Sequence, residues 1–284
     1  MARVDPVFIT RTPAEVTPFP LAPNVCVSFP HREDWWNRYP ALHKARNGQK
    51  RTMDDLQLLY ENQKRSHRES VFKRLNRLKH RATGRAVFAE LRSRRAYSVH
   101  IFPFAFLPSI DGDGRNWLGA TDPLYIPQTR WERAHGIKPR GTQLQTRGVY
   151  WTSDDKSSAA DVYYSDERCE ESDADGTLLH ELVHAMRRIS GLDHETVMGG
   201  GYPNSEEFLA NTIEMIYRSE RGQHIFDFVY HPIDQASVLK RPQARALITA
   251  LCHKQMSLCI ALSQVEADFN PIRPIAEKLF RIDL

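Results

Sequence analysis

A chain of 284 residues predicts one large domain or a domain with an appendage, and it is long enough to bury a sizeable hydrophobic core. Hydrophobic residues make up 41% of the sequence and charged residues 26%, which are ordinary values for a soluble globular protein. The formal net charge of +4 hides an asymmetry, because residues 44–95 hold 16 Lys or Arg against 5 Asp or Glu and the rest of the chain is acidic.

Membrane proteins, Sec-exported proteins and disulfide-stabilised proteins each carry a signature that this sequence lacks. No uncharged apolar run reaches 18 residues, so we expect no membrane-spanning helix. The first ten residues have no apolar stretch of signal-peptide length, so we expect no Sec-type export. The four cysteines are scattered without a C-x-x-C pair, which argues against a disulfide framework and fits a reducing compartment.

Six prolines lie within residues 1–30, and we interpret this segment as an extended, poorly ordered N-terminal arm. Residues 31–80 follow as a basic helical region. We interpret the basic charge as a solvated helical face, and the alternative is a surface that binds nucleic acid or an acidic partner.

Thr52 is a candidate N-cap with Asp55 three residues later, so we expect a helix from Met53 to about His80. The stretch Glu61–Ser70 has no apolar anchors, which leaves two helices as an alternative to one.

The centre of the chain predicts a small sheet. A short helix at Arg85–Leu91 precedes a strand at Tyr97–Leu107, which is rich in aromatic and β-branched residues. Two further strands, Gly148–Trp151 and Asp161–Tyr164, could pair as a hairpin. Helices dominate from Thr177 to the end, so the predicted fold class is α+β.

The segment His180-Glu-Leu-Val-His184 is an H-E-x-x-H motif. Residues four apart share one face of a helix, so the two imidazoles converge at a separation that suits a metal ion. Glu181 lies beside them, where it can take a proton from a water molecule. Zinc is the expected ion because it favours imidazole and carboxylate ligands.

The residues around the motif favour a buried, well-capped helix. Asp173 and Asp175 lie near its start, and Gly191 is placed to end it. The alternative to a metal site is a helix that carries two half-exposed histidines.

A catalytic zinc site of this kind needs a third protein ligand. The metzincin pattern requires Gly at position 187 and His at position 190, so Arg187 and Ser190 exclude that class. Downstream, Asn204 marks the start of a helix on which Glu207, Asn211 and Glu214 fall on one polar stripe.

Glu207 and Asn211 give the pattern E-x-x-A-N, which resembles the second helix of gluzincins. The resemblance implies that Glu207 is the third ligand and that Asn211 steadies a ligand histidine. Acidic residues also favour a helix N-terminus for purely structural reasons. The alternative ligands are Glu206, Asp193, His194 and Cys169.

Peptide hydrolysis also needs a donor for the developing oxyanion. Tyr217 is the candidate that we select, with Arg218 and Tyr202 as alternatives. A tyrosine on such a helix can equally belong to the hydrophobic core.

The span Leu178–Arg221 resembles the NleD-like effector metallopeptidases, which bacterial pathogens inject into host cells. The matching pieces are LLHELVHAMRRISG and NSEEFLANTIEMIYRSERG, and the lead-in around residues 83–91 is also similar. The resemblance implies a gluzincin-like fold, one catalytic zinc ion and cleavage of a protein inside a target cell. This chain differs from the family in its basic N-terminal part and its helical C-terminal extension.

We therefore expect a zincin-like metallopeptidase domain at residues 81–284, with a small mixed sheet and a mostly helical remainder. The expected function is a zinc-dependent endopeptidase, secreted without a Sec signal peptide and active in the target-cell cytosol, or otherwise cytoplasmic. A protein substrate, and a secretion chaperone or immunity protein, are the expected partners, and nucleic acid is not. The alternatives are a basic interaction module with a structural or vestigial zinc site and a zinc hydrolase that acts on a non-peptide amide.

Overall fold

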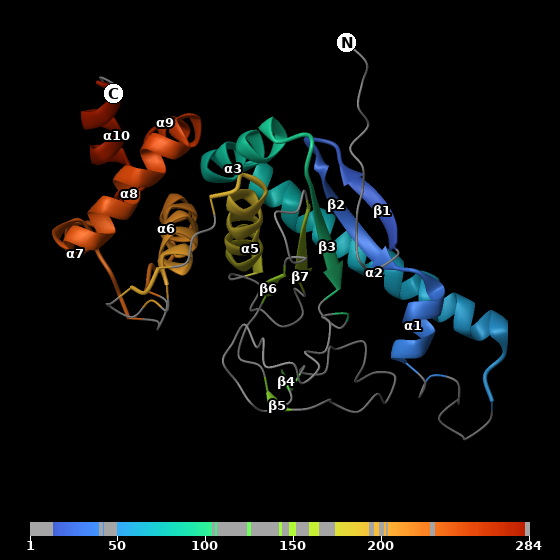
Figure 1. Ribbon diagram of the computed structural model, residues 1–284. Helices are drawn as coiled ribbons and strands as arrows, with labels where there is room; N and C mark the ends of the chain where they lie inside the picture. The colour runs from blue at the N-terminus through green and yellow to red at the C-terminus, as the bar shows by residue number, and fades with distance from the viewer. Residues whose placement is uncertain are drawn as a thin grey trace, which may run out of the picture.

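The computed structural model describes residues 14–39, 42, 50–103, 106, 124–125, 142–143, 148–151, 159–164, 174–192, 196–198, 202, 204–227 and 231–281. These residues form an α+β fold with one five-stranded mixed sheet and a mostly helical remainder, as the sequence predicts (Figure 1). The H-E-x-x-H motif at residues 180–184 and Glu207 both lie within the described residues.

The sheet has the strand order β1 (Ala14–Phe19), β2 (Ala22–Pro30), β3 (Ser98–Pro103), β7 (Ala159–Tyr164) and β6 (Gly148–Trp151). The two outer pairs are antiparallel, and β3 runs parallel to both of its neighbours. The predicted hairpin between the last two strands is confirmed as β6 and β7. A separate two-stranded pair joins β4 (Leu124–Tyr125) and β5 (Thr142–Gln143).

The helices are α1 (Arg32–Arg38), α2 (Met53–Lys79), α3 (Ala82–Ser93), α5 (Ala174–Ile189), α6 (Ser205–Glu220), α7 (Gln235–Lys240), α8 (Pro242–Lys254), α9 (Met256–Ser263) and α10 (Arg273–Phe280). Apolar side chains on one face of the sheet, such as Val27, Val99 and Val162, share a single core with α2, α3 and α5. Alternate side chains along these strands point to opposite faces, which explains why one face supplies this core.

The prediction of a disordered arm is wrong for residues 14–30, which form the hairpin β1–β2 at one end of the sheet. The prolines are compatible with this structure because of where they lie. Pro18 is in the edge strand β1 and Pro20 is in the turn, positions at which proline is tolerated, and Pro23 and Pro30 lie at the two ends of β2. Residues 1–13 lie outside the described residues.

The predicted boundary after residue 80 does not divide the hydrophobic core, because α2 is part of it. Thr52 and Asp55 form the expected capping box, and α2 continues without a break to Lys79. Its last turns carry Val71, Leu75 and Leu78 into the main core. Its first turns join a second cluster that comprises Phe29, Trp35, Tyr39, Leu42, Leu56 and Tyr60. The stretch without apolar anchors thus bridges two clusters within one helix.

A buried carboxylate ties α2 to the helices that carry the predicted site. Asp175, in the first turn of α5, is only 1% exposed. Its two oxygens lie 3.3 Å from Arg74 Nη1 on α2 and 3.3 Å from Arg221 Nη1, just after α6. Because a buried charge is tolerated only when it is paired, this network fixes α5 against both neighbours.

Within the described ranges, no single helix is long and apolar enough to cross a membrane. Only α8 and α9 taken together would meet that test, and they meet at a bend of 113°. The three described cysteines, Cys26, Cys252 and Cys259, are buried free thiols.

A buried histidine lies on the other face of the sheet. The His100 ring on β3 is fully buried, and its two nitrogens each lie 2.9 Å from a serine hydroxyl, that of Ser28 or Ser98. Burial lowers the pKa of His100 to about 4, since the charged form is desolvated.

Protonation of His100 should make the fold less stable in acid. A folded-state pKa below the unfolded value of about 6.5 means that the unfolded chain binds this proton more readily. The contribution of neutral His100 to the free energy of unfolding is therefore complete above about pH 6.5. It is lost as the pH falls towards 4, by up to about 3 kcal/mol. Denaturant unfolding at a series of pH values should give a shallower loss of stability for His100→Gln than for wild type. Parallel curves would show that His100 does not control this dependence.

Candidate metal centre

Helix α5 carries the H-E-x-x-H motif on a well-buried frame. Leu178, Leu179, Leu182 and Val183 are fully buried on its flanks. Gly191 ends the helix with φ +64°, a conformation that favours glycine, and the Leu192 N–H donates to the Arg187 carbonyl. The predicted C-terminal glycine signal is therefore confirmed.

Helix α6 lies beside α5 (Figure 1) and begins at the predicted N-cap. The Asn204 side chain accepts a hydrogen bond from the Glu207 N–H at 2.9 Å, which fixes the first turn of α6. Phe208, Ile213 and Ile216 are buried, so the apolar sides of α6 pack into the core. The polar stripe of α6 then faces the histidines of α5.

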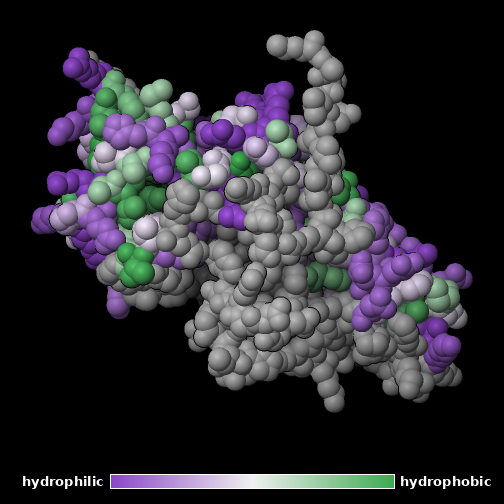
Figure 2. Space-filling model, in the orientation of Figure 1, coloured by the Kyte–Doolittle hydropathy of each residue, from purple (hydrophilic) through white to green (hydrophobic). Residues whose placement is uncertain are grey.

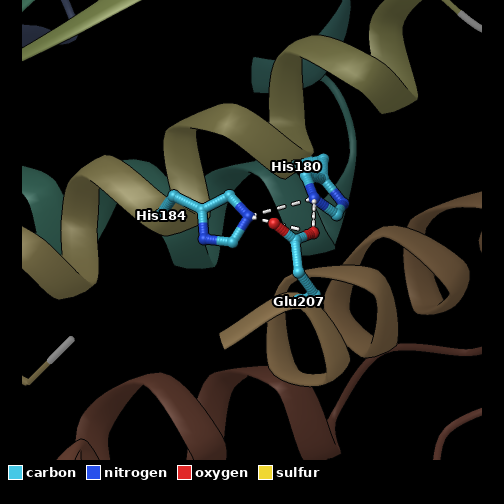
Figure 3. A group of neighbouring side chains, drawn as sticks. All are labelled: His180, His184 and Glu207. Atoms are coloured by element: carbon cyan, nitrogen blue, oxygen red, sulfur yellow. Dashed lines mark hydrogen bonds and ion pairs between the residues drawn. The ribbon is translucent and has the colours of Figure 1, made fainter. Parts of the chain in front are cut away.

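Three side chains from these two helices point towards one another, as Figure 3 shows. His180 Nε2 lies 3.1 Å from His184 Nε2 and 3.1 Å from Glu207 Oε2. The same Glu207 oxygen lies 3.5 Å from His184 Nε2. Two ring nitrogens and one carboxylate oxygen thus occupy the corners of a small triangle.

The size of this triangle fits a tetrahedral metal ion. Ligand bonds of about 2.0–2.1 Å, as zinc makes to nitrogen and oxygen, give ligand-to-ligand edges of about 3.3 Å in a tetrahedron. The three observed edges lie close to that length. All three atoms are lone-pair donors when unprotonated, so a cation at their centre would satisfy them together.

Glu181 is the fourth member of the predicted site, and it is buried next to the first histidine. Burial raises its pKa and the nearby carboxylates raise it further, whereas the two histidines oppose the shift. A carboxylate in this setting binds a proton more readily than an exposed one does.

Glu206 and Glu207 have different roles although they are neighbours. The Arg187 guanidinium on α5 donates two hydrogen bonds to Glu206, at 2.5 Å and 2.7 Å, and both side chains are buried. Of these two neighbours, Glu207 is the one that joins His180 and His184 in the triangle. The helical phase predicted from the sequence is therefore the one that the structure has.

The prediction for Asn211 is wrong, because its side chain does not steady a ligand histidine. Asn211 Oδ1 accepts a hydrogen bond from the Tyr202 hydroxyl at 3.0 Å. The contact expected of Asn211 is made by Glu214, whose Oε2 lies 3.1 Å from His180 Nδ1. Glu214 was visible in the sequence as the third member of the polar stripe.

Tyr217 is not placed at the metal centre, so the choice of oxyanion donor is not supported. Its ring is 1% exposed in the main core, and its hydroxyl accepts a hydrogen bond from Arg221 Nη1 at 3.3 Å. Ten residues along an α-helix separate it from Glu207 by about 15 Å. The alternatives are engaged elsewhere too, since Tyr202 donates to Asn211 and Arg218 pairs with Glu214.

The remaining candidate ligands, Cys169, Asp193 and His194, lie outside the described residues, as does Asp173 near the predicted helix start.

Substitution of the two neighbouring glutamates should separate metal binding from stability. Glu207→Ala removes a corner of the triangle and should abolish stoichiometric zinc binding, measured as metal content after dialysis. Glu206→Ala should keep the zinc but lower the free energy of unfolding by about 3–5 kcal/mol, because it leaves Arg187 buried without its carboxylate partner. Loss of zinc in Glu206→Ala, with zinc retained in Glu207→Ala, would contradict the assignment.

No family model, no curated protein and no solved structure matches this chain. The resemblance to the NleD-like peptidases therefore rests on the motif residues alone.

Proposed function

We propose that this chain is a zinc-dependent endopeptidase with a zincin-like fold. His180, His184 and Glu207 would hold one zinc ion, and Glu181 would act as the general base. The observation that carries the proposal is the convergence of the H-E-x-x-H histidines with a glutamate from the next helix. Two elements that are separate in sequence supply a ligand set of the type found in catalytic zinc enzymes.

The chemistry of the ligands favours zinc as the occupant. Two imidazoles and one carboxylate form a His2Glu set, which leaves a fourth position open for water or substrate. Magnesium and calcium prefer oxygen ligands only, and structural zinc sites are closed by a fourth protein ligand. A glutamate next to the first ligand would have no task in a structural site, which supports a hydrolytic one.

The bound zinc ion and Glu181 would have different roles in hydrolysis. When bound, zinc would polarise a peptide carbonyl and lower the pKa of a water molecule. Glu181 would accept a proton from that water and pass it to the nitrogen of the leaving amine. Glu181 is buried beside His180, so it would lie close enough to that water for both transfers.

The basic segment supports a structural or substrate-docking role and not a nucleic-acid site. Several of its charges have partners in the chain: Arg74 pairs with the buried Asp175, which Arg77 also approaches, and Lys64 pairs at the surface with Glu15 and Glu61. Figure 2 shows a mainly hydrophilic surface over the start of α2, where Asp54, Asp55 and Glu61 precede Lys64 and Arg65 in the sequence. Nucleic-acid sites instead concentrate basic residues on one face.

We further propose that the substrate is a protein inside a target cell and that the chain is a secreted bacterial effector or toxin. This part rests on the motif resemblance. A secretion chaperone or an immunity protein would then be its partner before delivery.

Glu181→Gln tests whether the protein acts as a peptidase. The substitution keeps the size of the side chain and removes the base, so proteolysis should fall by about 10²- to 10⁴-fold. We expect wild type to produce cleaved host proteins that are absent from cells expressing the variant, as measured by proteomics of newly formed N-termini.

The control is that Glu181→Gln binds about one zinc per chain and melts like wild type, since it changes no ligand. An effect on cells that is undiminished in Glu181→Gln would show that the protein acts by binding, and the peptidase proposal would fail.

A further inference from the structure

We infer that Glu214 is a positioning residue that orients His180 for metal binding, in the place where the sequence pattern suggested Asn211. The inference rests on the proposed metal site and adds to it a residue that does not itself contact the metal.

The two nitrogens of the His180 ring have different surroundings. Nε2 faces the triangle with His184 and Glu207, and Nδ1 lies 3.1 Å from Glu214 Oε2. When Nδ1–H donates to a carboxylate, the lone pair of the neutral imidazole is on Nε2, where a metal ligand needs it. Glu214 thus selects the tautomer and the ring orientation together.

The Glu214 carboxylate is itself held in place. Its other oxygen, Oε1, lies 2.9 Å from both Nε and Nη2 of Arg218, one helical turn later on α6. Glu214 is 7% exposed and Arg218 4%, so the pair is buried and its charges balance each other. The Arg218 guanidinium also lies over the Phe226 ring, 4.8 Å from its centroid. A carboxylate fixed in this way can hold the imidazole more rigidly than a solvated one can.

The first turn of α5 leaves room for this pair. A Cβ atom at Gly176 would lie 3.0 Å from Glu214 Oε1 and 3.2 Å from Arg218 Nη2. Gly176 is one turn before His180, on the same face of α5. On α6, Glu207, Glu214 and Arg218 are spaced by seven and four residues, which also places them on one face. The missing side chain at Gly176 on α5 thus leaves space for the Glu214–Arg218 pair on α6.

The same helix pair supplies a matched control. Glu206 on α6 is as buried as Glu214 and pairs with a buried arginine of α5, Arg187. It is not a member of the triangle, which His180, His184 and Glu207 form. If buried ion pairs matter only for folding, changes at Glu206 and Glu214 should have the same effect.

The test is the zinc dissociation constant of the full chain, measured by competition with a chromophoric chelator. We expect Glu214→Gln to weaken zinc binding by about 10- to 100-fold, the range seen for partners of ligand histidines. Glu206→Gln should lower the melting temperature of the metal-free protein and leave the zinc dissociation constant unchanged. Glu214→Asp should restore part of the affinity, because it retains the negative charge.

Glu214→Gln could fold poorly, since it leaves Arg218 buried without its partner. The double variant Glu214→Gln/Arg218→Met removes both charges and should fold, with the same weakened zinc binding. Zinc binding of wild-type strength in the folded single or double variant would overturn the role of Glu214 and leave the proposed function standing. Equal weakening in Glu206→Gln would overturn it as well. Absence of zinc binding by wild type would instead overturn the proposed function, and this inference with it.

Discussion

The contact between α5 and α6 is a polar seam inside an apolar interface, and the candidate centre depends on it. His180 meets Glu207 and Glu214, and Arg187 meets Glu206. Each of these groups is costly to bury alone, so each pair adds stability to the observed register of the two helices. A slip of one turn would leave several charges unpaired. Apolar contacts stabilise the packing of α5 against α6, and the polar pairs favour one axial register of the two helices.

The N-terminal half of the chain supports this helix pair. Asp175 connects the start of α5 to Arg74 on α2 and to Arg221 beyond α6. Helix α2 in turn packs against β2, which lies between β1 and β3 in the sheet. The basic segment, which its charge predicts to be a separate region, therefore belongs to the scaffold that supports α5 and α6.

The parts of the structure that the sequence predicted best are those set by local rules. The capping box at Thr52, the glycine at the end of α5 and the phase that separates Glu207 from Glu206 depend on residues within a few positions of one another. The N-terminal hairpin differs from the prediction because proline content alone does not exclude strands when the prolines lie at an edge, in a turn or at strand ends. The alternation in Val25-Cys-Val-Ser-Phe29 was a strand signal within the same segment.

Asn211 and Tyr217 were misplaced for a different reason. Both lie on the correct helix, but which of its residues meets His180 depends on the relative axial position of α5 and α6. Asn211 and Glu214 lie four and seven residues after Glu207, on the same face of the helix. Either residue could therefore be predicted from the sequence to contact the ligand histidine. The register depends on contacts between segments that are distant in the chain, such as Arg187 with Glu206 and His180 with Glu214. A single sequence does not show these contacts.

The central claim is that His180, His184 and Glu207 hold one metal ion, and X-ray absorption at the zinc edge tests it most directly. For the zinc-loaded full chain, the account predicts only nitrogen and oxygen neighbours at about 2.0–2.1 Å, with the outer-shell scattering of two imidazoles. A sulfur neighbour at about 2.3 Å would bring a cysteine such as Cys169 into the site and contradict the ligand set. Failure of the chain to retain zinc at all would contradict the claim altogether.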